Sequence, residues 1–331
     1  MSPAAGPAAV RERPTSPVTQ RAVAFVAQHK PAAEDLGRSL AELTGDPEAF
    51  ARALNEGLAT LADPEYLEGQ RRIAPGIADV IGIRWPLIEA VKRGFRESTR
   101  GDRTSTWLFV ADRLLREPPL EPRWFSFGML ERTIEDEPER TWQLVRRAAR
   151  EASDWITVDA LAHVAGKGIL NEAYRWAELE QLVYSPSRWE RRLVGSTVAT
   201  TPFVDHRRGR EPIVAANGLN LVRQLIGDDE PDVQKALAWG LRSLVLVDPA
   251  AVAAFCDEQA GIAERTNDGH RAWVIRDALA KLPADRAEPI KARLDGIRRR
   301  AGAPATSVAA EAAERFGQGM LGRPQPEPPL N

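Results

Sequence analysis

The chain repeats apolar side chains at the three- and four-residue spacing of an α-helix through almost all of residues 18–300. The clearest stripe consists of Val233, Leu237, Leu241 and Leu244. β-Branched residues gather between Thr197 and Val204, but they continue a helical pattern. We find no convincing strand in the sequence, and we therefore predict an all-α fold.

The predicted helices come in pairs, and the pairs recur. Leading helices are expected at intervals of roughly 35–45 residues, near Trp107, Trp142, Arg188, Val233 and Trp273. That period is typical of HEAT-like repeats, which stack into a curved solenoid with a concave face. We therefore predict a HEAT-like helical repeat solenoid with a concave basic face. A plain helical bundle is the alternative.

The two ends of the chain differ in composition from the repeats. Residues 1–17 and 301–331 are rich in Pro, Ala and Gly and hold few large apolar side chains, which is typical of disordered segments. We predict a disordered arm over 1–17, a repeat domain over 18–300 and a disordered tail over 301–331. Met1–Thr15 lacks the apolar stretch of a signal peptide, and no run is long enough to span a bilayer. We expect a cytoplasmic protein with no membrane partner.

Charge is unevenly distributed along the sequence. The 331 residues carry a net charge of −2, which argues against a wholly basic protein that coats nucleic acid. Between Glu139 and Gly227, however, the sequence contains thirteen Arg or Lys residues and ten Asp or Glu residues, a local excess of three positive charges. Arginine suits bidentate phosphate contacts, although we favour codon composition as the reason for its abundance over lysine.

Few groups in the sequence suit metal binding or covalent catalysis. The four histidines are scattered, and none has a His or Cys at ligand spacing. Cys256 is the single cysteine, which excludes an internal disulfide and a multi-cysteine metal site. Neither a glycine-rich phosphate loop nor a Ser or Cys nucleophile motif is present. We therefore expect no metal and no cofactor.

One segment places unusual side chains on a predicted helix face. Trp155 and Asp159 stand four residues apart, a spacing that puts the indole and the carboxylate one above the other. Asp159 also interrupts an apolar run around Val158 and Leu161, where a charge needs a reason. Arg192 occupies a similar place one repeat later. A buried Asp159–Arg192 pair would be structural, whereas a pair that faces a groove would be functional and would suit nucleic acid.

At these residues the sequence resembles the AlkD-like DNA alkylation repair family of HEAT-repeat DNA glycosylases. The resemblance extends over roughly residues 63–281. Three stretches carry it, in family order and at near-family spacing, namely Ser153–Asp159, Trp189–Arg192 and Val233–Arg242. A fainter similarity lies at Ile81–Pro86. Each motif alone is weak, but the three together are fairly specific.

The resemblance implies an enzyme that acts on double-stranded DNA carrying alkylated bases and hydrolyses the N-glycosidic bond of cationic alkylated purines. N3-methyladenine and N7-methylguanine are the typical substrates. It assigns Asp159 as the essential carboxylate, which stabilises the oxocarbenium-like sugar and orients water. It assigns Trp155 and Trp239 as aromatic walls and Arg192 as a contact to the DNA backbone, and we include the adjacent Arg191 among the DNA-binding residues. The family does not require the damaged base to enter a deep pocket, unlike most base-excising enzymes.

The chain departs from the family pattern just before the predicted helix of Trp239. The family has two adjacent aromatic residues there, and Pro231 and Asp232 occupy those positions in this chain. An acid and a proline remove stacking surface and can repel phosphate. The alternative function is therefore a catalytically inactive HEAT-repeat scaffold that binds DNA or protein.

Two basic clusters lie outside these motifs. We predict that Arg207 and Arg208 form a phosphate-contacting loop, and a solvated loop between helices is an equally good interpretation. Arg298–Arg300 are predicted to end a C-terminal helix, where the helix dipole favours cations, rather than to contact DNA. No lysine lies beside the motif, Lys235 being the nearest, so we expect a monofunctional glycosylase without strand cleavage. We also expect a monomer.

Overall fold

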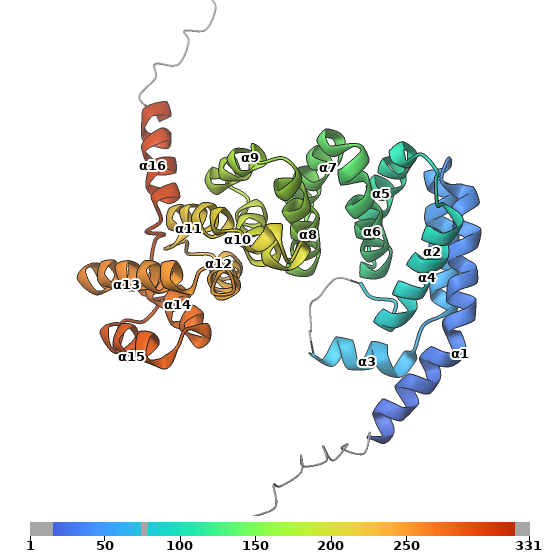
Figure 1. Ribbon diagram of the computed structural model, residues 1–331, viewed down its shortest axis with the longest axis horizontal. Coiled ribbons are helices and arrows are strands. Elements are labelled where there is room, and N and C mark those ends of the chain that lie inside the picture. The colour runs from blue at the N-terminus through green and yellow to red at the C-terminus, as the bar shows by residue number, and fades with distance from the viewer. Residues whose placement is uncertain (1–15, 74–78, 322–331) are drawn as a thin grey trace, which may run out of the picture. The chain divides into compact units, whose positions relative to one another are not determined.

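Sixteen α-helices and five short 3-10 helices, and no strand, make up the part of the chain that the structure describes. The structure is a computed structural model, and it describes residues 16–73 and 79–321 (Figure 1). These residues belong to two compact units. Unit 1 comprises Met1–Pro75 with Val80–Asp102, and unit 2 comprises Gly76–Asp79 with Arg103–Asn331. The prediction of an all-α fold is confirmed.

Unit 1 contains four α-helices. Its elements are α1 (Pro17–Leu40), α2 (Pro47–Thr60), α3 (Pro64–Ile73) and α4 (Trp85–Ser98). Helix α1 packs against α2 and α4. Gly37 of α1 lies against the backbone carbonyl of Val91, and Gly94 of α4 lies against that of Glu34, with no room for a Cβ atom at either glycine. The missing side chains allow the two backbones to approach closely.

Unit 2 contains the remaining twelve helices. They are α5 (Trp107–Leu115), α6 (Leu120–Asp136), α7 (Pro138–Glu151), α8 (Trp155–Asn171), α9 (Arg175–Gln181), α10 (Arg188–Val204), α11 (Pro212–Leu225), α12 (Pro231–Leu244), α13 (Pro249–Thr266), α14 (Gly269–Ala278), α15 (Ala284–Arg293) and α16 (Val308–Leu321). Helices α6, α8, α10, α12 and α14 form a row in which each packs on the next. Helices α7, α11 and α13 pack against members of this row.

These packed pairs are consistent with the predicted HEAT-like repeat. The positions predicted near Arg188, Val233 and Trp273 fall on α10, α12 and α14 of the row. Those near Trp107 and Trp142 fall on α5 and α7, which lie outside it. Trp142 is buried in α7, so its aromatic ring belongs to a helix that packs against the row and is not part of it. The basic character of a concave face stays a prediction.

Aspartate–proline pairs begin two of the helices. Asp46 accepts a hydrogen bond from the backbone N–H of Ala49 at 3.0 Å and caps α2. Asp248 does the same for α13 through Ala251 at 2.9 Å. In both cases proline follows the cap, where its fixed φ angle favours a helix and its missing N–H costs no bond.

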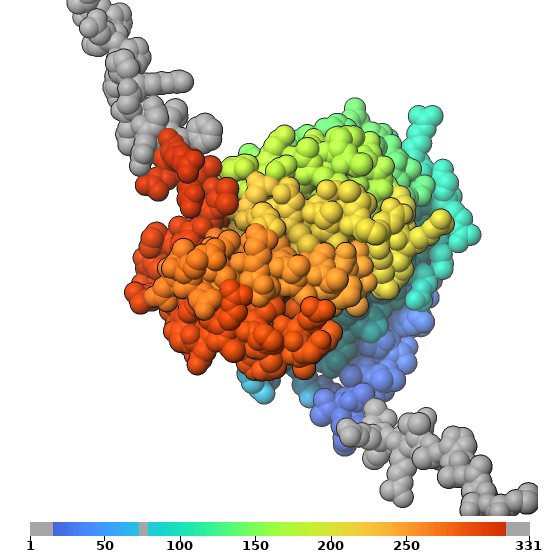
Figure 2. All heavy atoms as spheres, turned by 60° about the vertical axis from the view of Figure 1, so that its left-hand side comes forward, coloured from blue at the N-terminus to red at the C-terminus, as the bar shows by residue number. Residues whose placement is uncertain are grey.

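The C-terminal region is more regular than its composition indicates. The predicted tail, residues 301–331, includes α16, which packs against α11. Ser307 caps this helix by accepting a bond from the backbone N–H of Ala310 at 3.2 Å, and Ala309 is buried. Helices α13–α15 form the surface in the foreground of Figure 2. Residues 1–15 of the predicted arm and 322–331 of the predicted tail lie outside the described residues. No described helix is long and apolar enough to cross a membrane.

Candidate active site

The start of helix α8 determines where Trp155 and Asp159 lie. Asp154 has an extended backbone, and its Oδ1 accepts a hydrogen bond from the backbone N–H of Thr157 at 2.8 Å. The helix therefore begins at Trp155, and Asp159 follows one turn later on the same face. Trp155 is 46% exposed, so the start of the helix presents an indole to solvent.

One face of α8 is polar along most of its length. Trp155, Asp159, His163 and Lys167 follow one another at four-residue spacing, and each is at least partly exposed. The side chains between them are largely buried and apolar, among them Val158, Leu161, Ala162, Val164 and Ala165. Lys167 forms an ion pair with Glu135 of α6 at 2.8 Å. Asp159 thus lies on the outward face of a helix whose other faces form the core.

Arg192 of α10 binds both carboxylate oxygens of Asp159. Its Nε donates to Oδ1 at 3.0 Å and its Nη2 donates to Oδ2 at 2.8 Å. Ser196, one turn later in α10, donates its hydroxyl to Oδ1 at 2.6 Å. Two parallel charge-assisted bonds from one guanidinium give a strong and directional contact. The carboxylate is therefore fixed in position by its neighbours alone.

The pair lies at the edge of the packed interior. The side chain of Arg192 is 6% exposed and that of Asp159 is 17% exposed. Arg192 also donates through Nη1 to the backbone carbonyl of Asp232 at 2.6 Å, so one guanidinium joins α8, α10 and α12. These bonds use three of its five N–H hydrogens and leave two. The carboxylate keeps more contact with solvent than the guanidinium does.

The two predicted aromatic walls, Trp155 and Trp239, differ in their contacts with this pair. The guanidinium carbon of Arg192 lies 5.8 Å from the ring centroid of Trp155, near the outer limit of a cation–π contact. Trp239 is half-buried in α12, on the face that also carries Asp232. Gly195 of α10 lies against α12 with little room for a Cβ atom, so the two helices are close. Trp155, Asp159 and Arg192 thus form one cluster, and no described contact joins Trp239 to it.

The other predicted DNA-binding arginines have partners within the protein. Arg191 forms an ion pair with Asp228 at 2.7 Å, and its side chain is 15% exposed. Arg208 pairs with Asp205 at 2.9 Å and donates to the side-chain oxygen of Asn171 at 3.2 Å. Arg207 is exposed, and its backbone N–H donates to Asp205 at 2.9 Å. Of the three, Arg207 is the one whose side chain has no described partner. Their contact with DNA stays a prediction.

Ser196 is the polar side chain that the sequence reasoning missed. It stands four residues after Arg192, so both face the same side of α10. That spacing was a usable signal, because Trp155 and Asp159 were identified by the same spacing. The carbonyl of Asp232 could not be found in this way, since it depends on how closely α12 approaches α10.

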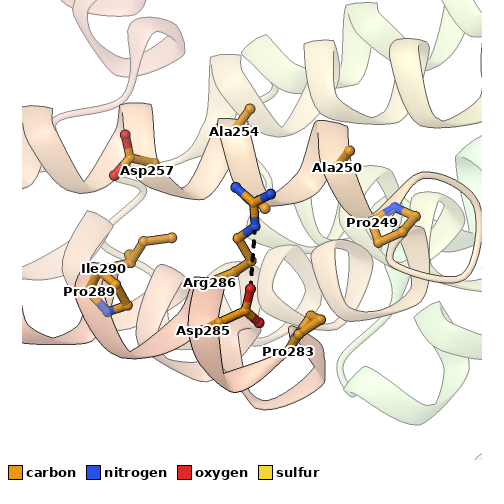
Figure 3. Close-up of a pocket in the computed structure, with 10 residues that line it drawn as sticks. Pro249, Ala250, Ala254, Asp257, Pro283, Asp285, Arg286, Pro289 and Ile290 are labelled. Carbon is orange, nitrogen blue, oxygen red and sulfur yellow. Dashed lines mark ion pairs between the residues drawn. The ribbon is translucent and has the colours of Figure 1, made fainter.

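A separate groove lies between α13 and α15 (Figure 3). Its volume is about 490 Å³, and none of the predicted site residues lines it. Alanine and proline side chains form most of its wall, beside Asp257 and the Asp285–Arg286 ion pair. The lining includes no aromatic side chain, so the groove offers no stacking surface for a base.

Metal-ligand clusters and reactive thiols are the other groups that could supply chemistry. The described residues contain no group of three or more His, Cys, Asp or Glu side chains that could hold a metal ion. Cys256 is buried, and burial raises the pKa of its thiol to about 12. A thiol that stays protonated at neutral pH is a poor nucleophile.

Comparison with known proteins finds a family with this sequence pattern. The family described as DNA alkylation repair enzyme matches residues 54–282. The match covers more than half of the 331 residues, and it includes all of the predicted site residues. No match was found among curated proteins.

Proposed function

Because this chain belongs to the DNA alkylation repair enzyme family, we propose that it is a monofunctional DNA glycosylase that hydrolyses the N-glycosidic bond of cationic alkylated purines. The family implies a DNA substrate. The observation that carries the finer proposal is the carboxylate of Asp159, which Arg192 and Ser196 hold next to the exposed indole of Trp155.

The substrate class explains why so small a set of groups suffices. A purine alkylated at N3 or N7 is positively charged. When the bond between C1′ and the base nitrogen breaks, its electron pair returns to the ring and the base leaves neutral. The sugar becomes cationic at C1′, water adds there, and the water gives up one proton. The charge that the protein must stabilise therefore develops on the sugar.

Asp159 is the proposed stabiliser of that charge. An anion acts most strongly on a developing cation when it is fixed in advance, because no reorganisation is needed during the reaction. The bonds from Arg192 and Ser196 fix the carboxylate in this way. Its 17% exposure leaves part of the group open to a ligand or a water molecule, which it can orient toward C1′.

The indoles of Trp155 and Trp239 are the proposed aromatic walls. An indole face attracts a cation through its negative quadrupole, by about 0.5–2 kcal/mol. Trp155 stands one turn before Asp159 and is open to solvent, so its ring can meet the sugar or the charged base near the carboxylate. Trp239 would do the same from α12. A shallow surface of this kind needs no deep base pocket.

Arg192 is proposed to hold Asp159 and to contact the DNA backbone. Three of its N–H hydrogens bind within the protein, and the two that remain suit a phosphate oxygen. Lys235 is exposed and lies 3.9 Å from Asp232, with no described contact to Asp159. A lyase step needs an amine at C1′, and so the proposal is hydrolysis alone.

A second candidate is a HEAT-repeat scaffold without catalysis. The observation that favours it is the same ion pair, because a nearly buried arginine neutralises Asp159 and occupies both of its oxygens. Such a pair would hold α8 to α10 and nothing more. Asp232 adds a second carboxylate within 4.0 Å of Arg192, which opposes phosphate binding.

Release of free base from methylated duplex DNA decides between the two candidates. A glycosylase releases N7-methylguanine faster than enzyme-free DNA does, and it leaves the strand unbroken until the abasic site is cleaved by heat or alkali. A scaffold releases no base above the spontaneous rate. Circular dichroism on the same sample confirms that an inactive protein is folded, so a folded protein without base release contradicts the glycosylase proposal.

A further inference from the structure

Three consecutive arginines, Arg298–Arg300, follow the last helix of the α13–α15 group. The prediction that they end a C-terminal helix is wrong, because α15 ends at Arg293 and residues 297–300 are not helical. They also lie beyond residue 282, where the family match ends. Helix-dipole stabilisation therefore does not explain them.

The segment that carries these arginines is fixed along helix α14. At one end of α14, Arg276 donates to the backbone carbonyls of Leu294 at 2.9 Å and Ile297 at 2.8 Å. At the other end, Gly269 lies against the backbone carbonyl of Arg298 with no room for a Cβ atom. At the same end of α14, His270 Nε2 donates to the carbonyl of Ala303, three residues after Arg300, at 3.1 Å. The direction follows because a carbonyl can only accept.

Arg299 is held at the end of α12 that also contacts Arg192. Its guanidinium carbon lies 4.5 Å from the ring centroid of Trp273, and its Nη1 donates to Gln234 Oε1 at 2.7 Å. Gln234 stands two residues after Asp232 in the first turn of α12, and the carbonyl of Asp232 accepts from Arg192 at 2.6 Å. The arginine segment and the Asp159–Arg192 cluster are thus connected through the same turn.

The positive charge of this segment is only partly balanced. Arg298 lies 3.6 Å from Asp295, and its side chain is 64% exposed. The described partners of Arg299 are uncharged, and the exposed side chain of Arg300 has no partner in the part of the chain that the structure describes. Burial lowers the pKa of Arg276, and the neighbouring Arg298 and Arg299 lower it further. The surface therefore attracts an anion.

We propose that Arg298, Arg299 and Arg300 form a second phosphate-binding site. It contacts the backbone of duplex DNA at a place separate from the Asp159 cluster. The inference rests on the proposed function in that it takes DNA as the ligand. Guanidinium groups bind phosphate oxygens bidentately, and such contacts position a protein on DNA without reading its sequence. Because the backbone of the segment is already ordered along α14, little backbone freedom is lost when the phosphate binds.

The test is the affinity for undamaged duplex DNA as a function of salt concentration, measured by fluorescence anisotropy. The variant is the double substitution Arg298→Gln with Arg300→Gln, which leaves Arg299 and its contacts to Gln234 and Trp273 in place. Each lost phosphate contact lowers the slope of log affinity against log salt by about 0.9, so we expect a slope shallower by about 2. Affinity should fall alike for unrelated DNA sequences.

The matched control is Arg286→Gln with Lys291→Gln on α15. Both side chains are exposed, and each pairs with a carboxylate, Asp285 and Glu288 respectively. This variant loses the same charge and should keep the wild-type slope. An unchanged slope in the arginine variant, or an equal change in the control, overturns the inference.

The outcomes also separate this inference from the proposed function. Binding that weakens as expected without any base release supports the second phosphate site and contradicts the glycosylase. Base release by the wild-type protein, together with an unchanged slope in the arginine variant, supports the glycosylase and contradicts the second phosphate site. A wild-type protein with negligible DNA affinity at low salt overturns both.

Discussion

Two aspartate–arginine pairs extend from helix α8, and they differ in what else the carboxylate binds. Asp154 pairs with Arg123 of α6 at 3.0 Å, and both side chains are 8% exposed. Asp159 pairs with Arg192 of α10 at 2.8 Å and is the more exposed of the two carboxylates. The residue types and the distances are nearly the same. The surroundings are not, and they indicate which pair serves folding.

Asp154 accepts hydrogen bonds at the start of its own helix, and the bonds to a neighbouring loop come from its partner Arg123. It accepts from the N–H and the hydroxyl of Thr157, and so caps α8. Its partner Arg123 donates to the carbonyls of Pro118 and Pro119, just before α6. The described bonds of this pair thus cap the start of α8 and fix the loop before α6. Both side chains are almost fully buried.

Asp159 stands inside the helix and caps nothing. Its described bonds all come from side chains of α10, and part of its carboxylate reaches solvent. The same two residue types therefore close a helix start at one place and, further along the same helix, hold a carboxylate that is partly open to solvent.

The largest effect on stability is expected for Asp154→Ala. The substitution leaves Arg123 buried without its partner, at a cost of about 3–5 kcal/mol, and it removes a helix cap worth about 1 kcal/mol. Urea denaturation measures the loss in the free energy of unfolding. Asp46→Ala is the matched control, because Asp46 caps α2 without a described ion pair. Equal losses in the two variants would show that the buried pair adds nothing.

A loss of catalysis without a loss of fold is expected for Trp155→Ala and Trp239→Ala. Each removes an indole worth about 0.5–2 kcal/mol to a developing cation, so base release should slow by roughly 2- to 30-fold. Trp189→Ala serves as the control, since Trp189 is half-buried and stacks with Arg188 outside the cluster. If all three variants slow alike, the indoles act through packing and not at the site.

Ser196→Ala should have a smaller effect on the rate. It deletes one hydrogen bond to Asp159 and leaves both bonds from Arg192. A bond of this kind contributes about 1 kcal/mol, which corresponds to roughly fivefold slower base release. Ser126→Ala also removes a buried hydroxyl, which donates to a backbone carbonyl of α6, and it should leave the rate unchanged. A wild-type rate in Ser196→Ala would mean that Arg192 alone positions the carboxylate.

The smallest effect on stability is expected for the Asp205–Arg208 pair, which is more exposed than the two pairs of α8. The side chain of Arg208 lowers the pKa of Asp205 to about 2, helped by the backbone N–H groups of Arg208 and Arg207. A lowered pKa means that the contribution to stability is present above the ordinary value of 3.8 and is lost as pH falls toward 2. NMR titration of the carboxyl carbon measures this midpoint. Arg208→Gln should raise it, and an unchanged midpoint would exclude the side chain as the cause.

Local patterns were sufficient to predict the helices, and one spacing was sufficient for much of the cluster. The caps at Asp46 and Asp248 and the four-residue step from Trp155 to Asp159 depend on near neighbours in the sequence. The pairing of Asp159 with Arg192 was anticipated, because a charge among apolar residues needs a partner, and a buried pair and a pair that faces a groove were the two alternatives. The family resemblance supplied Trp239, which no described contact links to the cluster.

Tertiary packing determined what could not be predicted. The helix over Val308–Leu321 has a composition typical of disorder, yet it packs on α11 and is capped by Ser307. The position of Arg298–Arg300 along α14 depends on bonds from Arg276 and His270 to distant carbonyls. A sequence pattern does not record such contacts, because a backbone carbonyl has the same chemistry at every residue.

The most direct test of the account is the rate of base release by Asp159→Asn under single-turnover conditions. Asparagine keeps the shape and can still accept a bond from Arg192, but it carries no charge for the sugar cation. We expect a barrier higher by about 2–4 kcal/mol, which is roughly 30- to 1,000-fold slower release, from a protein that is still folded. A variant that releases N7-methylguanine at the wild-type rate would contradict the proposed role of Asp159 in base release and return it to a structural role like that of Asp154.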